Sequence, residues 1–296
     1  MTTNFPFGTA TVFDSRRCSI GEGPVWDRVS GRVFWVDILG KKVYWKRISD
    51  NEVGEFEMPS HVGAFLPGED SAWWAFLVDG VYRFDEASGD LDKVADFPHS
   101  LASENGVARM RANDAAVSPW GEVLCGTMPY EPDAFPESGS LYRFNGQELE
   151  PLVMNVTISN GIGWTSDQSR MFFIDTPTGR VDQFDLDATG QLANRRIFAV
   201  IDSSLGLPDG LAVDGDGYVW VALWKGGRIQ RLAPDGSLAG FIKIPCQQVT
   251  SCAFVGEDLK TLVITTAAIN DKNEGAGITY AFGASAAGSP SFLVKS

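Results

Sequence analysis

One unit recurs six times along this chain, and it constrains the fold more than any other feature. Each copy has an apolar run, a tight turn, a second apolar run, another turn and a third run of alternating character. In the clearest copy, residues 207–232, the turns fall at 214–217 and 225–227, between runs rich in Val, Trp, Tyr and Leu. Glycine- and aspartate-containing turns between runs of this length predict β-hairpins.

The six copies predict a closed propeller. Their spacing of about 40–50 residues is that of a β-propeller blade. Segments between copies, such as 196–200 and 238–243, supply a fourth strand, and residues 10–13 supply the outer strand of the last blade, which closes the ring and removes its edges. We therefore predict an all-β, six-bladed β-propeller with a central metal-binding channel, formed by residues 1–296 as one domain. The alternatives are a β-sandwich and a series of unrelated hairpins.

Composition and charge exclude several classes of function. The 296 residues carry a net charge of −14, which argues against a nucleic-acid partner, because such binding needs clustered basic residues. The same charge would repel strongly anionic substrates unless a metal ion offset it locally. No apolar run approaches the roughly 20 residues of a membrane span, and the N-terminus lacks a secretory signal pattern. We expect a cytoplasmic protein with no membrane partner.

The four cysteines form no C-x-x-C pair, which excludes a zinc ribbon or a thioredoxin motif. Cys125 and Cys252 lie within apolar runs. We expect all four to be reduced, without a Cys246–Cys252 disulfide.

Aligning the six copies brings polar residues to the same point, just before the first strand of each blade. Because the first strand lines the channel of a propeller, these residues form a ring around the axis. The ring consists of Glu22, His61, Asn113, Asn160, Asp209 and Thr250. An ordinary turn explains each Asn-Gly or Asp-Gly pair alone. Their shared register indicates a binding site.

Three ring residues predict a metal site. Glu22, Asn160 and Asp209 offer two carboxylates and an amide oxygen, which are hard ligands suited to Ca²⁺, Mg²⁺ or Mn²⁺. Their two negative charges balance one divalent cation. A zinc site with three histidines is excluded, because the chain has only two histidines. The absence of a G-x-S-x-G motif disfavours a serine-histidine-aspartate triad.

Six short motifs follow one another along the chain. They lie at 21–26 (GEGPVW), 34–38 (FWVDI), 111–114 (RAND), 126–128 (GTM), 158–161 (ISNG) and 208–210 (PDG). Together they resemble the SMP-30/gluconolactonase (regucalcin-like) family from about residue 18 to residue 282. The resemblance implies a six-bladed propeller that holds one divalent metal through Glu22, Asn160 and Asp209.

The resemblance also implies substrate-binding residues. A sugar-binding arginine falls on Arg111, and the position that helps to bind metal or substrate hydroxyls falls on Asn113. Some members use a glutamate shortly after the Gly-Thr-Met motif. In this chain Tyr130 or, one residue on, Glu131 takes its place, so the details of sugar recognition depart from the family pattern.

The ring and the resemblance together predict a metal-dependent lactonase, a carboxylic ester hydrolase. It would open a sugar lactone, such as glucono-, xylono-, galactono- or arabinonolactone, to the aldonic acid. The metal polarises the carbonyl, Asp209 is the general base, and Arg111 and Asn113 hold sugar hydroxyls. Ca²⁺ is the first candidate for the metal, and Zn²⁺, Mn²⁺, Mg²⁺ and Fe²⁺ are alternatives.

Two other functions stay open. A calcium-dependent phosphotriesterase-like hydrolase would prefer an open apolar pocket, and Arg111 and Asn113 count against it. A non-catalytic propeller that binds calcium or a partner protein would lack a base beside the metal. Because a closed propeller has no exposed edge, we expect a monomer.

The loop at 129–139 is either a cover over the channel mouth or a plain connection. Three prolines stiffen it, and Tyr130 and Phe135 could lie over a ligand. Trp224 and Lys225, in a comparable turn, are further candidates for the mouth.

Overall fold

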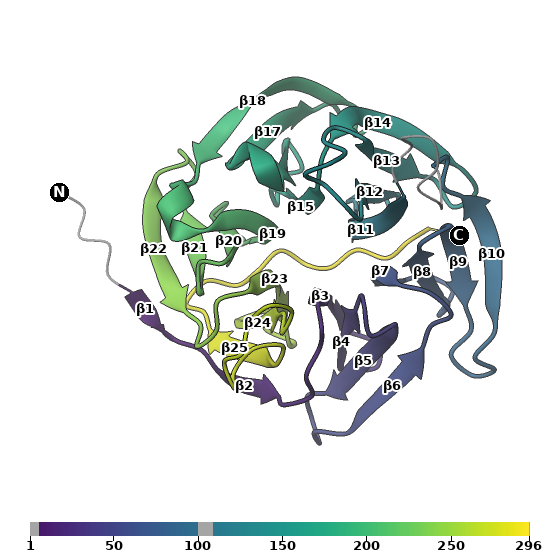
Figure 1. The fold of residues 1–296 in the computed structure, drawn as a ribbon, viewed down its shortest axis with the longest axis horizontal. Helices are drawn as coiled ribbons and strands as arrows, with labels where there is room; N and C mark the ends of the chain where they lie inside the picture. Colours follow the sequence, from purple (N-terminus) through teal and green to yellow (C-terminus); the bar gives the residue numbers. More distant parts are fainter. Residues whose placement is uncertain (1–5, 100–108, 296) are drawn as a thin grey trace.

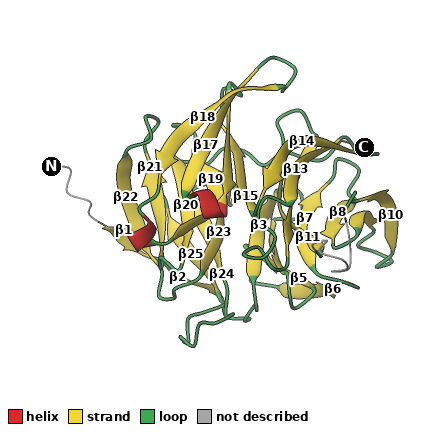
Figure 2. Cartoon of the chain, turned by 45° about the horizontal axis from the view of Figure 1, so that its top comes forward, coloured by secondary structure: helices red, strands yellow, loops and turns green. Residues whose placement is uncertain are grey.

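The computed structural model describes residues 6–99 and 109–295 and confirms the six-bladed β-propeller (Figure 1). Within these residues six sheets surround a central channel, and the strands of each blade follow one another from the channel outward. The helical segments described are two short 3₁₀ turns, η1 (Thr176–Thr178) and η2 (Ser203–Leu205) (Figure 2). In this part of the chain no helix has the length and apolar character needed to cross a membrane.

Blades 1 to 5 each use one copy of the repeat and the segment that follows it, and blade 6 uses the sixth copy and an N-terminal strand. Blades 1 and 2 contain β3 (Gly21–Asp27), β4 (Arg32–Asp37), β5 (Lys42–Arg47), β6 (Val53–Glu57), β7 (Val62–Pro67), β8 (Trp73–Leu77), β9 (Gly80–Phe84) and β10 (Leu91–Asp96). Blades 3 and 4 contain β11 (Met110–Val117), β12 (Val123–Pro129), β13 (Gly139–Phe144), β14 (Leu149–Val156), β15 (Ser159–Trp164), β16 (Arg170–Asp175), β17 (Arg180–Leu186) and β18 (Leu192–Val200). Blades 5 and 6 contain β19 (Leu207–Val213), β20 (Val219–Trp224), β21 (Arg228–Leu232), β22 (Leu238–Lys243), β23 (Val249–Val255), β24 (Thr261–Thr266) and β25 (Thr279–Gly283).

The N-terminal segment closes the ring in the predicted way. β2 (Thr11–Asp14) pairs antiparallel with β25 and completes blade 6. β1 (Pro6–Thr9), which the sequence analysis did not predict, pairs parallel with β22 as a fifth strand of blade 5. The ring of Phe7 lies 6.1 Å from that of Trp220 in the same blade. One segment therefore ties two blades together.

Apolar faces of neighbouring blades form the core. Middle strands such as β8 and β12 are buried along their whole length, because each sheet is covered by a blade on both sides. Between blades 1 and 2, the ring of Trp73 lies 4.7 Å from that of Phe65 and 4.0 Å from that of Phe34. All four cysteines lie in described parts of the chain and are buried, including Cys125 and Cys252 in the strands predicted for them.

The C-terminal segment runs across one end of the channel (Figure 1). Gly288 forms a β-bridge with Asp214 beside blade 5, and Val294 forms one with Gly68 beside blade 2. A cavity of about 170 Å³ lies between this segment and the inner strands. The segment therefore lies over the inner strands at this end of the channel.

Candidate metal and substrate site

Five of the predicted site residues line one cavity of about 240 Å³. They are Glu22, Arg111, Asn113, Asn160 and Asp209, and they come from the inner strands of blades 1, 3, 4 and 5. The rest of the wall consists of Ile20, Ile38, Met128, Ile158, Thr176, Leu207, Trp224 and Thr250. A few converging polar groups in a mostly apolar wall are typical of a small-molecule site.

Irregular strand pairing positions these side chains. In all six blades the register between the first two strands shifts at the ring, for example between Glu22 and Val25 and between Pro208 and Leu211. Such β-bulges re-aim side chains out of the regular alternation. Five of the six ring residues lie within their strands, so the prediction that they precede the strands was wrong for these five. Only His61 precedes its strand, and it does not line the cavity.

Glycine at two bulges lets neighbouring inner strands approach the ring. A Cβ at Gly63 would lie 2.6 Å from the carbonyl oxygen of Asn113, and one at Gly161 would lie 2.8 Å from that of Asp209. Both distances are shorter than a van der Waals contact. Any side chain at these two points would push adjacent strands apart and widen the ring.

A chain of hydrogen bonds links four polar side chains of the wall. Arg111 Nη1 donates to Asn113 Oδ1 at 2.7 Å, and Asn113 Nδ2 donates to Asn160 Oδ1 at 2.8 Å. Asn160 Nδ2 in turn donates to Thr176 Oγ1 at 2.8 Å. All four residues are at most 7% exposed. Water therefore competes little for these bonds, and the side chains are held in one arrangement.

Glu22 and Asp209 place two carboxylates in the same wall. Both are buried, and burial is the main cause that raises the pKa of each well above its ordinary value. The charges of Asp209 and Asp114 raise the pKa of Glu22 further, and Asp114 also raises that of Asp209. The N–H of Gly23, 2.8 Å from Glu22 Oε2, and the charge of Arg111 act in the opposite direction.

Asp114 is a charged residue of the channel that the sequence analysis missed. It follows Asn113 at the same bulge and lines the cavity on the side of the C-terminal segment. Part of its surface faces that cavity, yet burial raises its pKa to about 7. The sequence did contain a clue to Asp114, since it follows Asn113 in the RAND motif. Consecutive strand residues point in different directions, so one can face each of the two cavities. Trp224, a candidate from the sequence, lies in the cavity wall, whereas Lys225 does not.

The donor set suits a hard divalent cation. Glu22, Asp209 and Oδ1 of Asn160 bring oxygen atoms from three blades to one cavity. No ion pair among the described residues involves either carboxylate. Residues 6–99 and 109–295 also contain no cluster of three or more His, Cys, Asp or Glu side chains that could hold a metal. A cation here would therefore need amide oxygens, which Ca²⁺ accepts readily.

Tyr130 lies beside the site through its contact with Arg111. The guanidinium groups of Arg109 and Arg111 lie 4.6 and 6.0 Å from the centre of its ring, and its hydroxyl is 2.6 Å from His61 Nδ1. Glu131 is exposed and does not line the cavity. A substrate contact of either residue, and a covering role of the 129–139 loop, stay predictions.

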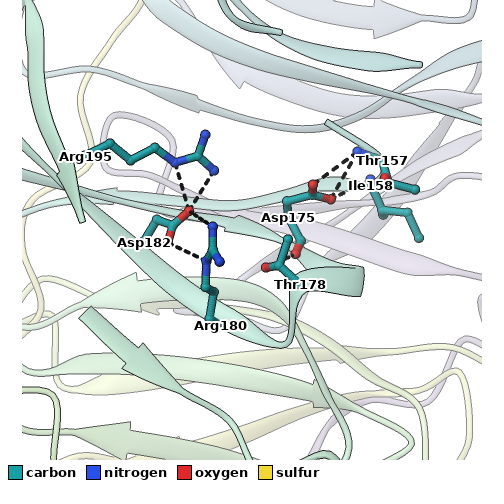
Figure 3. Close-up of polar contacts among 7 residues, drawn as sticks. All are labelled: Thr157, Ile158, Asp175, Thr178, Arg180, Asp182 and Arg195. Atoms are coloured by element: carbon teal, nitrogen blue, oxygen red, sulfur yellow. Dashed lines mark hydrogen bonds and ion pairs between the residues drawn. The ribbon is translucent and has the colours of Figure 1, made fainter. Parts of the chain in front are cut away.

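A buried aspartate fixes the segment that leads into β15. The Asp175 carboxylate, at the end of β16, accepts hydrogen bonds from the backbone N–H groups of Thr157 and Ile158 at 3.2 and 2.9 Å (Figure 3). These groups lie just ahead of Asn160. Because buried N–H groups need acceptors, the aspartate specifies the path of the chain into the ring.

A second buried carboxylate lies near Asp175 on β17. Asp182, only 2% exposed, forms ion pairs with Arg180 at 2.8 Å and with Arg195 at 2.6 Å (Figure 3). The pair with Arg195 joins β17 to β18 at the outer side of blade 4, and the pair with Arg180 lies within β17. They belong to the frame of the blade rather than to the cavity, which neither arginine lines.

Fold and site together define a class: a six-bladed propeller with an oxygen-donor site on its axis. Residues 20–268 match the family model described as the SMP-30/Gluconolactonase/LRE-like region. The chain belongs to this family, as its motifs predicted.

Relatives cover most of the chain. A 6-deoxy-6-sulfogluconolactonase of Pseudomonas putida is 33% identical over 258 residues, which are 86% of each protein. A pentonolactonase of Haloferax volcanii is 32% identical over 264 residues, 88% of this chain and 85% of that protein. The crystal structure of a calcium-binding protein, regucalcin, from Agrobacterium tumefaciens superposes with a TM-score of 0.89 at 27% identity over 99% of both chains.

Proposed function

We propose that this protein is a metal-dependent lactonase that hydrolyses a sugar lactone to the corresponding hydroxy acid. The observation that carries the proposal is the pair of buried carboxylates, Glu22 and Asp209, in one small cavity with the Asn160 amide and the Arg111 guanidinium. Membership of the family and two relatives named as lactonases support it.

The residues present fit one divalent cation, held by Glu22, Asn160 and Asp209. Ca²⁺ is the first candidate, since the donors are all oxygens and a regucalcin of the same fold is described as calcium-binding. A cation bound there supplies Lewis-acid polarisation of the lactone carbonyl. The charge of such a cation would lower the pKa of both carboxylates and so oppose the effect of their burial.

Asp209 acts as the general base in this proposal. Its carboxylate takes a proton from the attacking water while the water oxygen bonds to the carbonyl carbon of the lactone. The bond between that carbon and the ring oxygen then breaks, and the ring oxygen takes the proton from Asp209. One water is consumed, one hydroxy acid is released, and Asp209 returns to its ionised form.

Arg111 and Asn113 bind the sugar through opposite kinds of hydrogen bond. Within residues 6–99 and 109–295, Arg111 donates to the protein through Nη1, and in this proposal its Nε and Nη2 donate to substrate oxygens. Asn113 Nδ2 already donates to the Ser159 carbonyl and to Asn160, each at 2.8 Å. Toward a ligand Asn113 can therefore only accept, through Oδ1.

The test is hydrolysis of pentono- and hexonolactones by protein stripped with a chelator and refilled with Ca²⁺, Mn²⁺, Mg²⁺, Zn²⁺ or Fe²⁺. We expect activity to vanish on stripping and to return with at least one metal. Asp209→Asn should abolish turnover, whereas Asp216→Asn, at an exposed turn of the same blade, should not. Rates equal to buffer with every metal would overturn the proposal. Cation binding without turnover would indicate a binding protein instead.

A further inference from the structure

The amide of Asn160 poses a problem of orientation for the proposed cation site. An asparagine ligates a cation only through Oδ1, because Nδ2 carries two hydrogens and can only donate. The two ends of the amide have nearly the same shape, so packing alone does not select between them. A hydrogen-bonding partner must therefore decide which end of the amide faces the cation site.

Partners with a single hydrogen-bonding role decide it. Arg111 can only donate, and the Ser159 carbonyl can only accept, so Asn113 presents Oδ1 to the first and Nδ2 to the second. The same Nδ2 also lies 2.8 Å from an atom of Asn160, which must then be the acceptor Oδ1. Asn160 Nδ2 is left facing Thr176, whose hydroxyl oxygen accepts from it at 2.8 Å.

The hydroxyl of Thr176 is itself held in place. Thr176 is buried, and its N–H donates to the Ile158 carbonyl at 3.1 Å. The preceding Asp175 accepts from the Ile158 N–H at 2.9 Å (Figure 3). The backbone N–H and carbonyl of Ile158 are thus both hydrogen-bonded to the start of η1. This places the Thr176 hydroxyl next to the Asn160 amide.

Blade 1, which carries Glu22, repeats this connection with one difference. Asp37 accepts from the Ile20 N–H at 3.0 Å, and the Ile38 N–H donates to the Ile20 carbonyl at 2.9 Å. At the position of Thr176, blade 1 has the apolar Ile38. A carboxylate has two equivalent oxygens and needs no partner to orient it. The hydroxyl is therefore present in the blade whose ligand is an amide, and absent in the blade whose ligand is a carboxylate.

We propose that Thr176 is a positioning residue: Asn113 decides which end of the Asn160 amide is Oδ1, and the Thr176 hydroxyl, by accepting a hydrogen bond from Nδ2, holds the amide so that Oδ1 stays at the cation site. The inference rests on the proposed function only in requiring that the ring binds a cation.

The test uses three variants of the full chain. Thr176→Val removes the hydroxyl and keeps the branched shape, and Thr176→Ser keeps the hydroxyl. Thr178→Val removes a hydroxyl of the same turn that donates to the Asp175 carbonyl, away from Asn160. Ca²⁺ and Mn²⁺ affinity is measured by calorimetric titration. We expect Thr176→Val to weaken binding about 10–100-fold, the usual cost of losing a group that orients a ligand. Thr176→Ser should recover most of the affinity, and Thr178→Val should match the wild type.

Thermal unfolding in a chelator separates positioning from support of the fold, and we expect Thr176→Val and Thr178→Val to unfold at similar temperatures. Wild-type affinity in Thr176→Val, or an equal loss in both valine variants, would overturn the inference. If the wild type binds the cation but hydrolyses no lactone, the proposed reaction fails and the positioning role stands. If the wild type binds none of the five metals of the activity test, both the proposed function and this inference fall.

Discussion

Replacing Asp114 by asparagine should stabilise the metal-free protein. Asp114 lies in the channel near the carboxylates of Glu22 and Asp209, whose pKa values it raises. Burial raises its own pKa to about 7. Asparagine has nearly the same shape without the charge, so it removes the cost of keeping an ionised group in this position.

The raised pKa of Asp114 gives the size and the sign of the expected change in the free energy of unfolding. A rise from the ordinary value of 3.8 to about 7, at about 1.4 kcal/mol per pH unit, corresponds to about 4 kcal/mol in the free energy of unfolding. Because the channel screens part of the charge, we expect a gain of about 2–3 kcal/mol at pH 8. The folded state binds this proton more tightly than the unfolded state. The penalty is therefore fully present above pH 7 and disappears as the pH falls toward 4.

The assay is urea unfolding in a chelator at pH 5 and at pH 8. The free energy of unfolding of Asp114→Asn should exceed that of the wild type at pH 8, and the difference should shrink at pH 5. Asp167→Asn is a control of opposite sign, because hydrogen bonds from Thr165 and Ser169 lower the pKa of Asp167 to about 2. Loss of that carboxylate should destabilise the protein. An Asp114→Asn variant without a gain at pH 8, or with the same gain at both pH values, would refute the reasoning.

Three further predictions concern the ring. Asp209→Asn should lower kcat at least about 100-fold, measured by lactone hydrolysis with the fold checked by circular dichroism, and near-normal kcat would exclude it as the base. Gly63→Ala should lower the free energy of unfolding by about 1–3 kcal/mol, because its Cβ would lie 2.6 Å from the Asn113 carbonyl oxygen. An unchanged urea midpoint would contradict this. Cation affinity should rise from pH 5 to pH 8, because the raised pKa values of Glu22 and Asp209 let protons compete with the cation. Calorimetric affinities equal at both pH values would contradict it.

The architecture was predictable from the sequence because its signals are local. Each hairpin depends on a turn and on the two runs beside it, and the period of these units distinguishes a propeller from other β folds. Even the closing strand followed from counting blades: residues 10–13 were predicted, and β2 covers Thr11–Asp14. The parallel pairing of β1 with β22 has no such local signal, because the two strands are far apart in the chain and neither sequence specifies its partner.

The ring was predictable in register but only partly in content. Aligning the repeats identified Glu22, Asn160 and Asp209, which line one cavity. It could not tell that His61 stays out of the wall or that Asp114 lies in the channel. Which side chain a bulge directs inward depends on pairing with the next strand, and short sequence patterns do not encode that pairing uniquely.

The sequence by itself determined the blades, their number and the chemical types around the axis, because these follow from patterns between near neighbours in the chain. Closure of the ring, which pairs β2 with the distant β25, followed from the number of blades. Only the tertiary structure decided how those side chains are oriented. The bond from Asn113 to Asn160 joins two blades, and the bond from Asn160 to Thr176 joins a strand to a turn after its partner strand. The direction of an amide depends on such partners, which come together only when the ring has closed.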